Sequence, residues 1–285
     1  SSYPNGGGYT YGATNAPENP GSGGGGGAAA TCAGGGAVRI QATGIVTVNG
    51  TINANGSNTT SYGYGGGSGG GVYITCNTFG GTSNGLISVN GGNHALPDYS
   101  GGGGGGRIAV SYSVLAANCA VRFSASAGLT WQDLIPRQNT VYGPMMGTLW
   151  LPDTQLITTN IRNSLFIDVR IVIPGFTAWR PGSLTISNCS FTIEQTNFLL
   201  AATNRIMIRN GGLGVYGNIS TRNGDLVLTN SGNLYVYSAP TNGVGNNYGA
   251  RVGITGNVDI AASSWIYPFC DENTGGSVLF RMNNL

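Results

Sequence analysis

Hydrophobic residues alternate with polar ones over many short stretches of this chain. In the clearest stretch, Asp168, Arg170 and Val172 separate the apolar residues Leu165, Ile167, Val169, Ile171 and Ile173. A period of two places one face of an extended strand on a core and the other in water. Capped stretches with apolar residues at helical spacing are absent from the sequence. The pattern therefore predicts an all-β protein.

From residue 184 onward, short apolar strands come in pairs. The pairs are Leu184 with Phe191, Ile206 with Leu213, Leu226 with Leu234, and Val252 with Val258. Their first members follow one another at similar intervals along the chain. Two short strands in each such interval are typical of a parallel β-helix, a solenoid that we expect to be right-handed. A β-sandwich also has frequent turns and is the alternative.

Three glycine runs lead directly into strand-like segments. Gly34 to Gly36 precede Ala37, Gly69 to Gly71 precede Val72, and the six residues Gly101, Gly102, Gly103, Gly104, Gly105 and Gly106 precede Arg107. Glycine loses more backbone freedom on folding than any other residue, so such runs must serve a backbone role. We interpret them as extended threads of the polyproline-II type, with about three residues per turn, which pack against one another through their amides. A flexible linker is the alternative, but linkers do not begin strands repeatedly.

The glycine-rich part contains an internal repeat. Its first two units each close a strand with a Val-Asn-Gly turn, at Val48-Asn49-Gly50 and at Val89-Asn90-Gly91, and we align these two turns as equivalent. We expect a third unit to start at Gly101 and to be truncated. Of the 52 glycines, 34 lie before residue 107, and the composition changes after that point. The sequence therefore predicts a glycine-rich region at 1–115 and a β-solenoid domain at 116–285.

Charge is scarce, and this excludes two classes of partner. Only 8% of the residues are charged, all basic residues are Arg, and the net charge is +2. Binding to nucleic acid or to an anionic membrane needs a denser positive patch. Membrane insertion is also not expected, because no apolar run reaches the length of about 20 residues needed to span a bilayer. A neutral surface rich in Asn, Thr and Gly favours an extracellular or cell-surface protein.

Five cysteines are spread along the chain, namely Cys32, Cys76, Cys119, Cys189 and Cys270. There is no C-x-x-C pair and a single histidine, His94, which argues against a metal centre and a redox motif. For an extracellular chain we expect disulfides among these residues, with one cysteine left free or bridging two subunits. We expect no cofactor.

The glycine-rich segments also carry a family likeness. Tyr11-Gly12, Pro20-Gly21 and the three runs with their strands resemble the glycine-rich repeats of very long, secreted, uncharacterised bacterial surface proteins. The segments 263–268 and 275–281 resemble a motif that precedes the glycine region in such proteins, whereas here they follow it. In packing, the runs are similar to polyglycine-II bundles of phage tail-fibre adhesins and of a glycine-rich antifreeze protein. The resemblance implies an extracellular structural role and brings no catalytic residues.

Candidates for catalysis are weak. Asp271 and Glu272 are the only adjacent carboxylates, in a stretch that we expect to be a solvated loop, whereas glycosidases need a positioned pair. His94 has no Ser or Cys nucleophile near it in sequence, and Asp168 with Arg170 suggests a surface ion pair. A phosphate loop would need a Lys and a helix, and calcium-binding repeats need an Asp in each repeat. Glycosylation sequons at Asn55, Asn58, Asn188 and Asn218 are common by chance in such a chain.

Three functions fit these observations. The first is a structural protein that polymerises with itself into an extracellular filament or sheath. The second is a carbohydrate-binding adhesin or tail-fibre-like protein with a polysaccharide partner, and the third is a β-helix enzyme that degrades polysaccharides. We expect the first, and not an enzyme, with assembly through the segments that hold Ser1, Tyr3, Val278 and Phe280.

Overall fold

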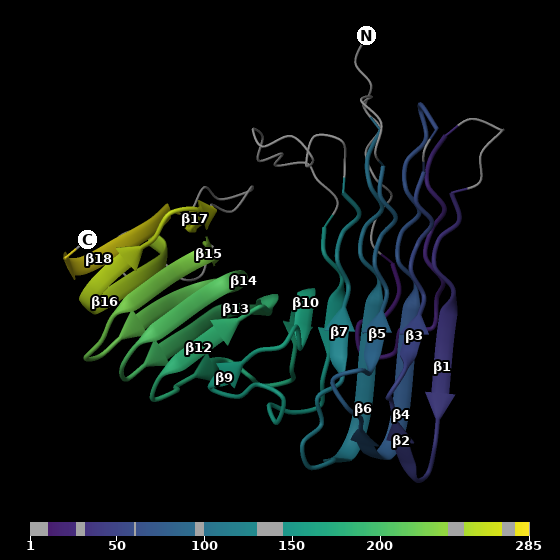
Figure 1. Cartoon of the computed structure of the whole chain (residues 1–285), viewed down its shortest axis with the longest axis horizontal. Coiled ribbons are helices and arrows are strands. Elements are labelled where there is room, and N and C mark those ends of the chain that lie inside the picture. Colours follow the sequence, from purple (N-terminus) through teal and green to yellow (C-terminus); the bar gives the residue numbers. More distant parts are fainter. Residues whose placement is uncertain are drawn as a thin grey trace. The chain divides into compact units, whose positions relative to one another are not determined.

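Parallel strands make up the fold (Figure 1). The computed structural model describes residues 11–26, 32–59, 61–94, 100–129, 145–238, 248–269 and 277–284. Within these residues every regular element is a strand, which confirms the prediction of an all-β protein. The chain divides into two units, Ser1–Trp150 and Leu151–Leu285. The first unit extends past the predicted boundary at residue 115 because the strands that follow it pair with earlier strands of the same unit.

The described residues of the first unit form eight strands. They are β1 (Ala37–Gln41), β2 (Ile45–Thr47), β3 (Thr51–Asn53), β4 (Gly71–Gly80), β5 (Leu86–Ser88), β6 (Arg107–Leu115), β7 (Arg122–Ser124) and β8 (Thr148–Trp150). One parallel ladder runs β1–β4–β6–β8 and another runs β3–β5–β7, while β2 pairs with the end of β4. Val38, Val72 and Ile108 stack in the first ladder, so two successive coils have nearly the same length.

This register corrects the predicted repeat. The Asn49-Gly50 turn lies against residues 82–86, with the Thr82 N–H donating to Asn49 Oδ1 (3.0 Å) and the Leu86 N–H donating to the Gly50 carbonyl (2.9 Å). The alignment of Val48-Asn49-Gly50 with Val89-Asn90-Gly91 was therefore wrong. The expectation of a truncated third unit was wrong too, because β6 and β7 complete that coil. Hydrogen bonds between coils, and not the similarity of the turns, set the register.

In the second unit, the residues that the structure describes form ten strands. They are β9 (Asn160–Ile161), β10 (Phe166–Val172), β11 (Ala178–Trp179), β12 (Leu184–Ser187), β13 (Ser190–Ala202), β14 (Ile206–Thr221), β15 (Leu226–Tyr237), β16 (Tyr248–Ile260), β17 (Trp265–Phe269) and β18 (Ser277–Asn284). Each coil contributes to three parallel ladders, an arrangement consistent with a β-solenoid. The ladders run β9–β12–β14–β15–β16, β10–β13–β14–β15–β17 and β11–β13–β14–β16–β18.

The predicted strand pairs agree with these ladders except for the last pair. Leu184, Ile206 and Leu226 stack in one ladder, and Phe191, Leu213 and Leu234 stack in the next. The pairing of Val252 with Val258 as a fourth pair was wrong. Val258 stacks on Leu226, whereas Val252 belongs to the third ladder and stacks on Ile219. The coil from Leu226 to Val258 is longer than the coils before it, because a longer connection separates β15 from β16.

Both units have cores built from inward-facing rows of apolar side chains. Val72, Ile74, Ile108 and Val110 of the first unit are fully buried, as are Leu184, Ile206 and Leu226 of the second. Full burial of a side chain of this size stabilises the fold by about 1.5–3 kcal/mol. The alternation breaks at Asp168, which adopts a φ of 47° where the register between β10 and β13 shifts. Such a bulge re-aims the residues that follow it.

Candidate functional site

Glycine-rich segments of the first unit bind one another side by side (Figure 1). We call them segments I (20–26), II (32–36), III (54–59), IV (65–70), V (89–94), VI (101–106) and VII (124–129). In segment IV the N–H groups donate to three different neighbours in turn. The bonds are Gly65 to Gly25 and Ser68 to Ser22 of segment I, Gly66 to Gly101 and Gly69 to Gly104 of segment VI, and Gly67 to Ser57 and Gly70 to Ala54 of segment III, all between 2.8 and 3.0 Å. The pattern repeats every third residue.

Segments II and V bind to segment IV through its carbonyl groups. The Ser68 oxygen accepts from the Gly35 N–H (2.8 Å), and the Gly67 oxygen accepts from the Gly92 N–H (2.7 Å). Segment IV thus bonds to five others through its backbone. Such bonding satisfies polar groups that a packed glycine segment would otherwise leave without partners.

Only some glycines of the run Gly101 to Gly106 need to lack a side chain. A Cβ on Gly103 would overlap the carbonyl oxygen of Gly67, and Gly102, Gly105 and Gly106 meet backbone atoms as closely. A Cβ on Gly101 would meet nothing within 4 Å, and one on Gly104 would meet only the Met145 oxygen at 3.7 Å. The expectation that all six glycines are needed for packing is therefore wrong for Gly101, where a Cβ would point to open space, and for Gly104, where it would make only an ordinary van der Waals contact.

Asparagines form two rows across the same coils, which sequence reasoning missed. Asn55 Oδ1 accepts from the Asn90 N–H (2.6 Å), and Asn90 Oδ1 accepts from the Ser126 N–H (2.8 Å). Further along the same segments, Asn58 Oδ1 accepts from the Asn93 N–H (2.8 Å). The signal was a pair of asparagines at a spacing of three, which occurs at Asn55 and again at Asn90. This spacing places both asparagines on one side of a thread with about three residues per turn.

A corner of the second unit uses asparagine in a different way. Asn188 and Asn210 adopt φ of 54° and 47°, in the left-handed region, and Asn230 follows at 48°. Asn tolerates this conformation better than most residues. The Asn210 side-chain amide also donates to Asn188 Oδ1 (2.7 Å). The three asparagines recur once per coil, so each of these coils turns this corner with the same residue type.

The last coil of the second unit leaves part of its core exposed. Among the described residues, β18 is the last strand of its ladder and pairs along one edge with β16, where Phe280 stacks on Val252. Val252 is buried, whereas Val278 and Phe280, two predicted assembly residues, are half-buried. The other two, Ser1 and Tyr3, lie outside the described residues.

The first coil of the first unit is exposed in the same way. Among the described residues, β1 is the first strand of one ladder and pairs along one edge with β4. Similarly, β3 is the first strand of another ladder and pairs along one edge with β5. Val38, Ile40 and Ile52 are half-buried in this coil, although the residues stacked on them in the next coil are fully buried. Each unit therefore has one terminal coil whose apolar row lacks a covering layer within the described residues.

Aromatic side chains stack on the outer face of β14, β15 and β17. Tyr216 and Tyr237 lie with ring centroids 4.4 Å apart, and Tyr237 and Phe269 are 5.0 Å apart. Their ring planes are within about 14° of parallel. Two aromatic side chains of β17, the last strand of this ladder, are exposed: Trp265 is 57% exposed and Phe269 is 38% exposed. Burial raises the pKa of Tyr235 and of Tyr237 to about 12.

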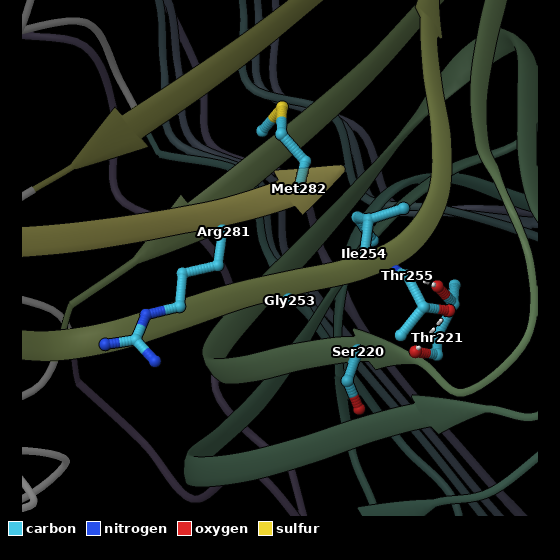
Figure 2. A pocket seen from close by; sticks show the side chains of 7 residues that line it. All are labelled: Ser220, Thr221, Gly253, Ile254, Thr255, Arg281 and Met282. Carbon is cyan, nitrogen blue, oxygen red and sulfur yellow. Dashed lines mark hydrogen bonds between the residues drawn. The ribbon is translucent and has the colours of Figure 1, made fainter. Parts of the chain in front are cut away.

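A hollow of about 440 Å³ lies on the third ladder of the second unit (Figure 2). It is lined by Ser220, Thr221, Gly253, Ile254, Thr255, Arg281 and Met282. Ser220, Gly253 and Arg281 stand at one register on β14, β16 and β18. The Thr255 hydroxyl donates to the Thr221 carbonyl (3.3 Å). This hollow was not predicted, because its residues come from three coils.

The four cysteines in the part of the chain that the structure describes do not form the expected disulfides. Cys32, Cys76 and Cys189 are buried free thiols, and Cys119 is a half-buried free thiol. Cys32 lies in segment II, Cys76 lies on β4, and Cys189 lies between β12 and β13 of the second unit. Burial raises the pKa of the Cys76, Cys119 and Cys189 thiols. Cys270 lies outside the described residues.

Of the catalytic candidates that the structure describes, His94 lies in the first unit, and Asp168 and Arg170 lie in the second. Arg170 pairs with Glu194 of β13 at 3.1 Å, and burial raises the pKa of Glu194 although Arg170 opposes the shift. His94 is buried in segment V, with its N–H donating to the Leu129 carbonyl (2.8 Å). Asp271 and Glu272 lie outside the described residues. Among the residues that the structure describes, no cluster of three or more His, Cys, Asp or Glu side chains is suited to hold a metal ion.

The structure contains no helix long and apolar enough to cross a membrane in the part of the chain that it describes. Comparisons of the chain with protein-family models, with curated proteins and with solved structures gave no match.

Proposed function

We propose that this chain is an extracellular structural protein that polymerises head to tail into a surface filament or sheath. One observation carries the proposal. The first coil of the first unit and the last coil of the second unit both hold apolar core rows that are only half-buried.

Terminal coils of this kind favour growth by addition of another coil. An edge strand offers a row of backbone N–H and C=O groups that can template a further strand. Covering Val278 and Phe280 would add about 1 kcal/mol for each half-buried side chain. If the parallel ladder continues into the next subunit, the edge of β18 meets the opposite edge of another chain, which is a contact between unlike surfaces. A contact between unlike surfaces that does not close into a ring gives a filament.

Two finer features belong to this proposal. We infer that the glycine segments are polyglycine-II helices, which is supported by the period of three in their hydrogen bonds and by the room for a Cβ at both Gly101 and Gly104. We also infer that the solenoid is right-handed, since parallel strands joined by a crossover are right-handed in nearly all proteins.

An extracellular location is supported by composition and by the cysteines. The neutral surface and the glycine-rich segments resemble those of secreted bacterial surface proteins. Buried thiols with raised pKa carry little thiolate, so Cys76 and Cys189 would resist oxidation outside the cell without forming disulfides.

Negative-stain microscopy and light scattering of the purified chain test the proposal. We expect filaments from the wild-type chain, and soluble monomers from Phe280→Asp, because a carboxylate in the terminal row cannot be buried. The matched control is Tyr62→Asp, which changes a 64% exposed aromatic outside the terminal coils and should leave filaments unchanged. Wild-type chain that stays monomeric at every concentration, or filaments of equal length from Phe280→Asp, would contradict the proposal.

A further inference from the structure

Three aromatic side chains lie side by side along β17. Trp265, Tyr267 and Phe269 occupy alternate positions of this strand, so all three stand on the same face. The ring centroids of Trp265 and Tyr267 are 6.3 Å apart and those of Tyr267 and Phe269 are 6.4 Å apart, with interplanar angles of 30° and 21°. These distances are close to the rise of about 6.4–6.8 Å between alternate residues of a strand. The three rings therefore form one nearly flat row, which we call the aromatic row.

The previous coil covers one side of the aromatic row. Tyr235 and Tyr237 of β15 stand in register with Tyr267 and Phe269, and the ring centroids of these pairs are 5.1 and 5.0 Å apart. Their planes are parallel to within 7° and 13°, so each pair stacks face to face. The opposite faces of Tyr267 and Phe269 point away from β15, and Trp265 beside them is more than half exposed.

The edge of β17 that faces away from β15 is poorly suited to pair with another strand. The Ser238 N–H donates to the Phe269 carbonyl (2.9 Å), so the backbone of Phe269 faces β15. Successive residues of a strand direct their backbone groups to opposite edges, which places those of Pro268 at the free edge. Proline has no N–H to donate to an added strand. A second copy is thus hindered from extending this ladder over the aromatic row, and the row stays open to another partner.

Size and charge argue against a protein or a nucleic acid as that partner. An aromatic side chain buries about 150–250 Å² in full, so three rings with one side covered offer roughly 300 Å². A stable protein interface needs about 800 Å² from each partner. β17 contains no charged residue, whereas binding to nucleic acid depends on Lys and Arg. A narrow, neutral chain molecule fits these properties.

We propose that the aromatic row binds a neutral polysaccharide with β-linkages of the cellulose type. The C–H groups on the face of a sugar ring are attracted to the negative face of an aromatic ring, and the O–H of Tyr267 and the indole N–H of Trp265 can bond to hydroxyls at the sugar's rim. Such β-linkages keep successive sugar rings in a flat, extended ribbon that can follow rings set in a straight line. The α-linkages of amylose curve the chain away from such a line. The row belongs to one strand of a single chain, so this binding does not rest on head-to-tail assembly.

Calorimetric titration of the full chain with cellohexaose tests the proposal. Maltohexaose is the matched arm, because it contains the same glucose rings joined by α-linkages. Cellohexaose should bind saturably, and maltohexaose should bind at least about tenfold more weakly. Equal binding of the two, or no saturable binding of cellohexaose, would overturn the proposal. The Phe280→Asp variant, in which we expect no filament, should bind cellohexaose as the wild type does; loss of binding there would place the ligand in the filament contact instead.

Variants of the aromatic row locate the site. Trp265→Ala removes the most exposed ring and should weaken binding at least about tenfold, whereas Trp265→Phe keeps an aromatic face and should lose less. Tyr62→Ala, at a 64% exposed aromatic of the first unit, is the control and should bind as the wild type does. If Trp265→Ala does not fold, Phe269→Ala decides in its place. Wild-type affinity in the alanine variant would show that the aromatic row is not the site.

Discussion

Replacing Gly103 by alanine adds one methyl group where the structure leaves no room for it. The new Cβ would overlap the carbonyl oxygen of Gly67, at a separation well below the 3.0 Å that real Cβ atoms keep. Both atoms belong to the hydrogen-bonded array, so neither can move alone. The Gly103 N–H donates to Gly92 (2.8 Å), its carbonyl accepts from Gly128 (2.8 Å), and the Gly67 carbonyl accepts from Gly92 (2.7 Å).

The size of the effect follows from these contacts. Weakening three backbone hydrogen bonds costs about 1 kcal/mol each, and overpacking adds about 1 kcal/mol or more. Alanine restricts the unfolded chain, which offsets this loss by roughly 0.4–1 kcal/mol. We therefore expect a net loss of about 3 kcal/mol in the free energy of unfolding. At about 2–4 °C per kcal/mol, the Tm should fall by about 6–12 °C.

Gly101→Ala is the matched control, because it makes the same chemical change in the same run where a Cβ meets nothing within 4 Å. It should leave the Tm unchanged or raise it slightly. Thermal unfolding measures both variants, and native-state hydrogen exchange should show faster exchange of the Gly92 and Gly128 amides in Gly103→Ala only. If the two variants melt within about 1 °C of each other, the array does not depend on its glycines as we argue.

Three further predictions concern other contacts. Asn90→Ala should lower the free energy of unfolding by about 1–2 kcal/mol in urea, because the Ser124 hydroxyl and the Ser126 N–H lose their acceptor. Asn90→Asp keeps an acceptor oxygen at this position and should lower the free energy of unfolding much less. Equal losses in the two variants would show that Asn90 Oδ1 does not stabilise the fold as an acceptor. Tyr237→Ala removes the middle ring of the stack between Tyr216 and Phe269 and should cost about 3 kcal/mol, against less than about 1 kcal/mol for Tyr237→Phe, in the same urea assay. The Tm should fall as pH rises from about 10 to about 12. The pKa of Tyr235 and of Tyr237 is about 12 in the folded chain, so over this pH range both tyrosines lose their protons more readily in the unfolded chain, which is thereby favoured. Replacing both tyrosines by Phe should flatten that fall in a pH series of melting curves, and an unchanged slope would show that these groups are not its cause.

Alternation of apolar and polar residues was sufficient to predict strands and most of the coil register in the second unit. Leu184, Ile206 and Leu226 stack as predicted because their coils have nearly equal lengths, so spacing along the chain equals spacing across coils. The prediction from spacing failed at Val252, because the coil from Leu226 to Val258 is longer than the coils before it. The interval from Leu226 to Val252 looked regular in sequence, but the hydrogen bonds place Val258 on Leu226.

In the glycine segments, too, the sequence predicted the local feature and the tertiary structure decided the contacts. Composition and the position of the runs before strands predicted that backbone packing uses them, and the repeated pair of asparagines was present in the sequence. Which glycines are needed was decided by tertiary structure, because a Cβ on Gly103 meets another segment and one on Gly101 does not. The hollow at Gly253 likewise joins residues from three coils. The periodicity of apolar residues reports the local conformation of a chain. Contacts between coils depend in addition on the length of every loop between them. For this reason only the folded structure could show which residues of different coils lie together.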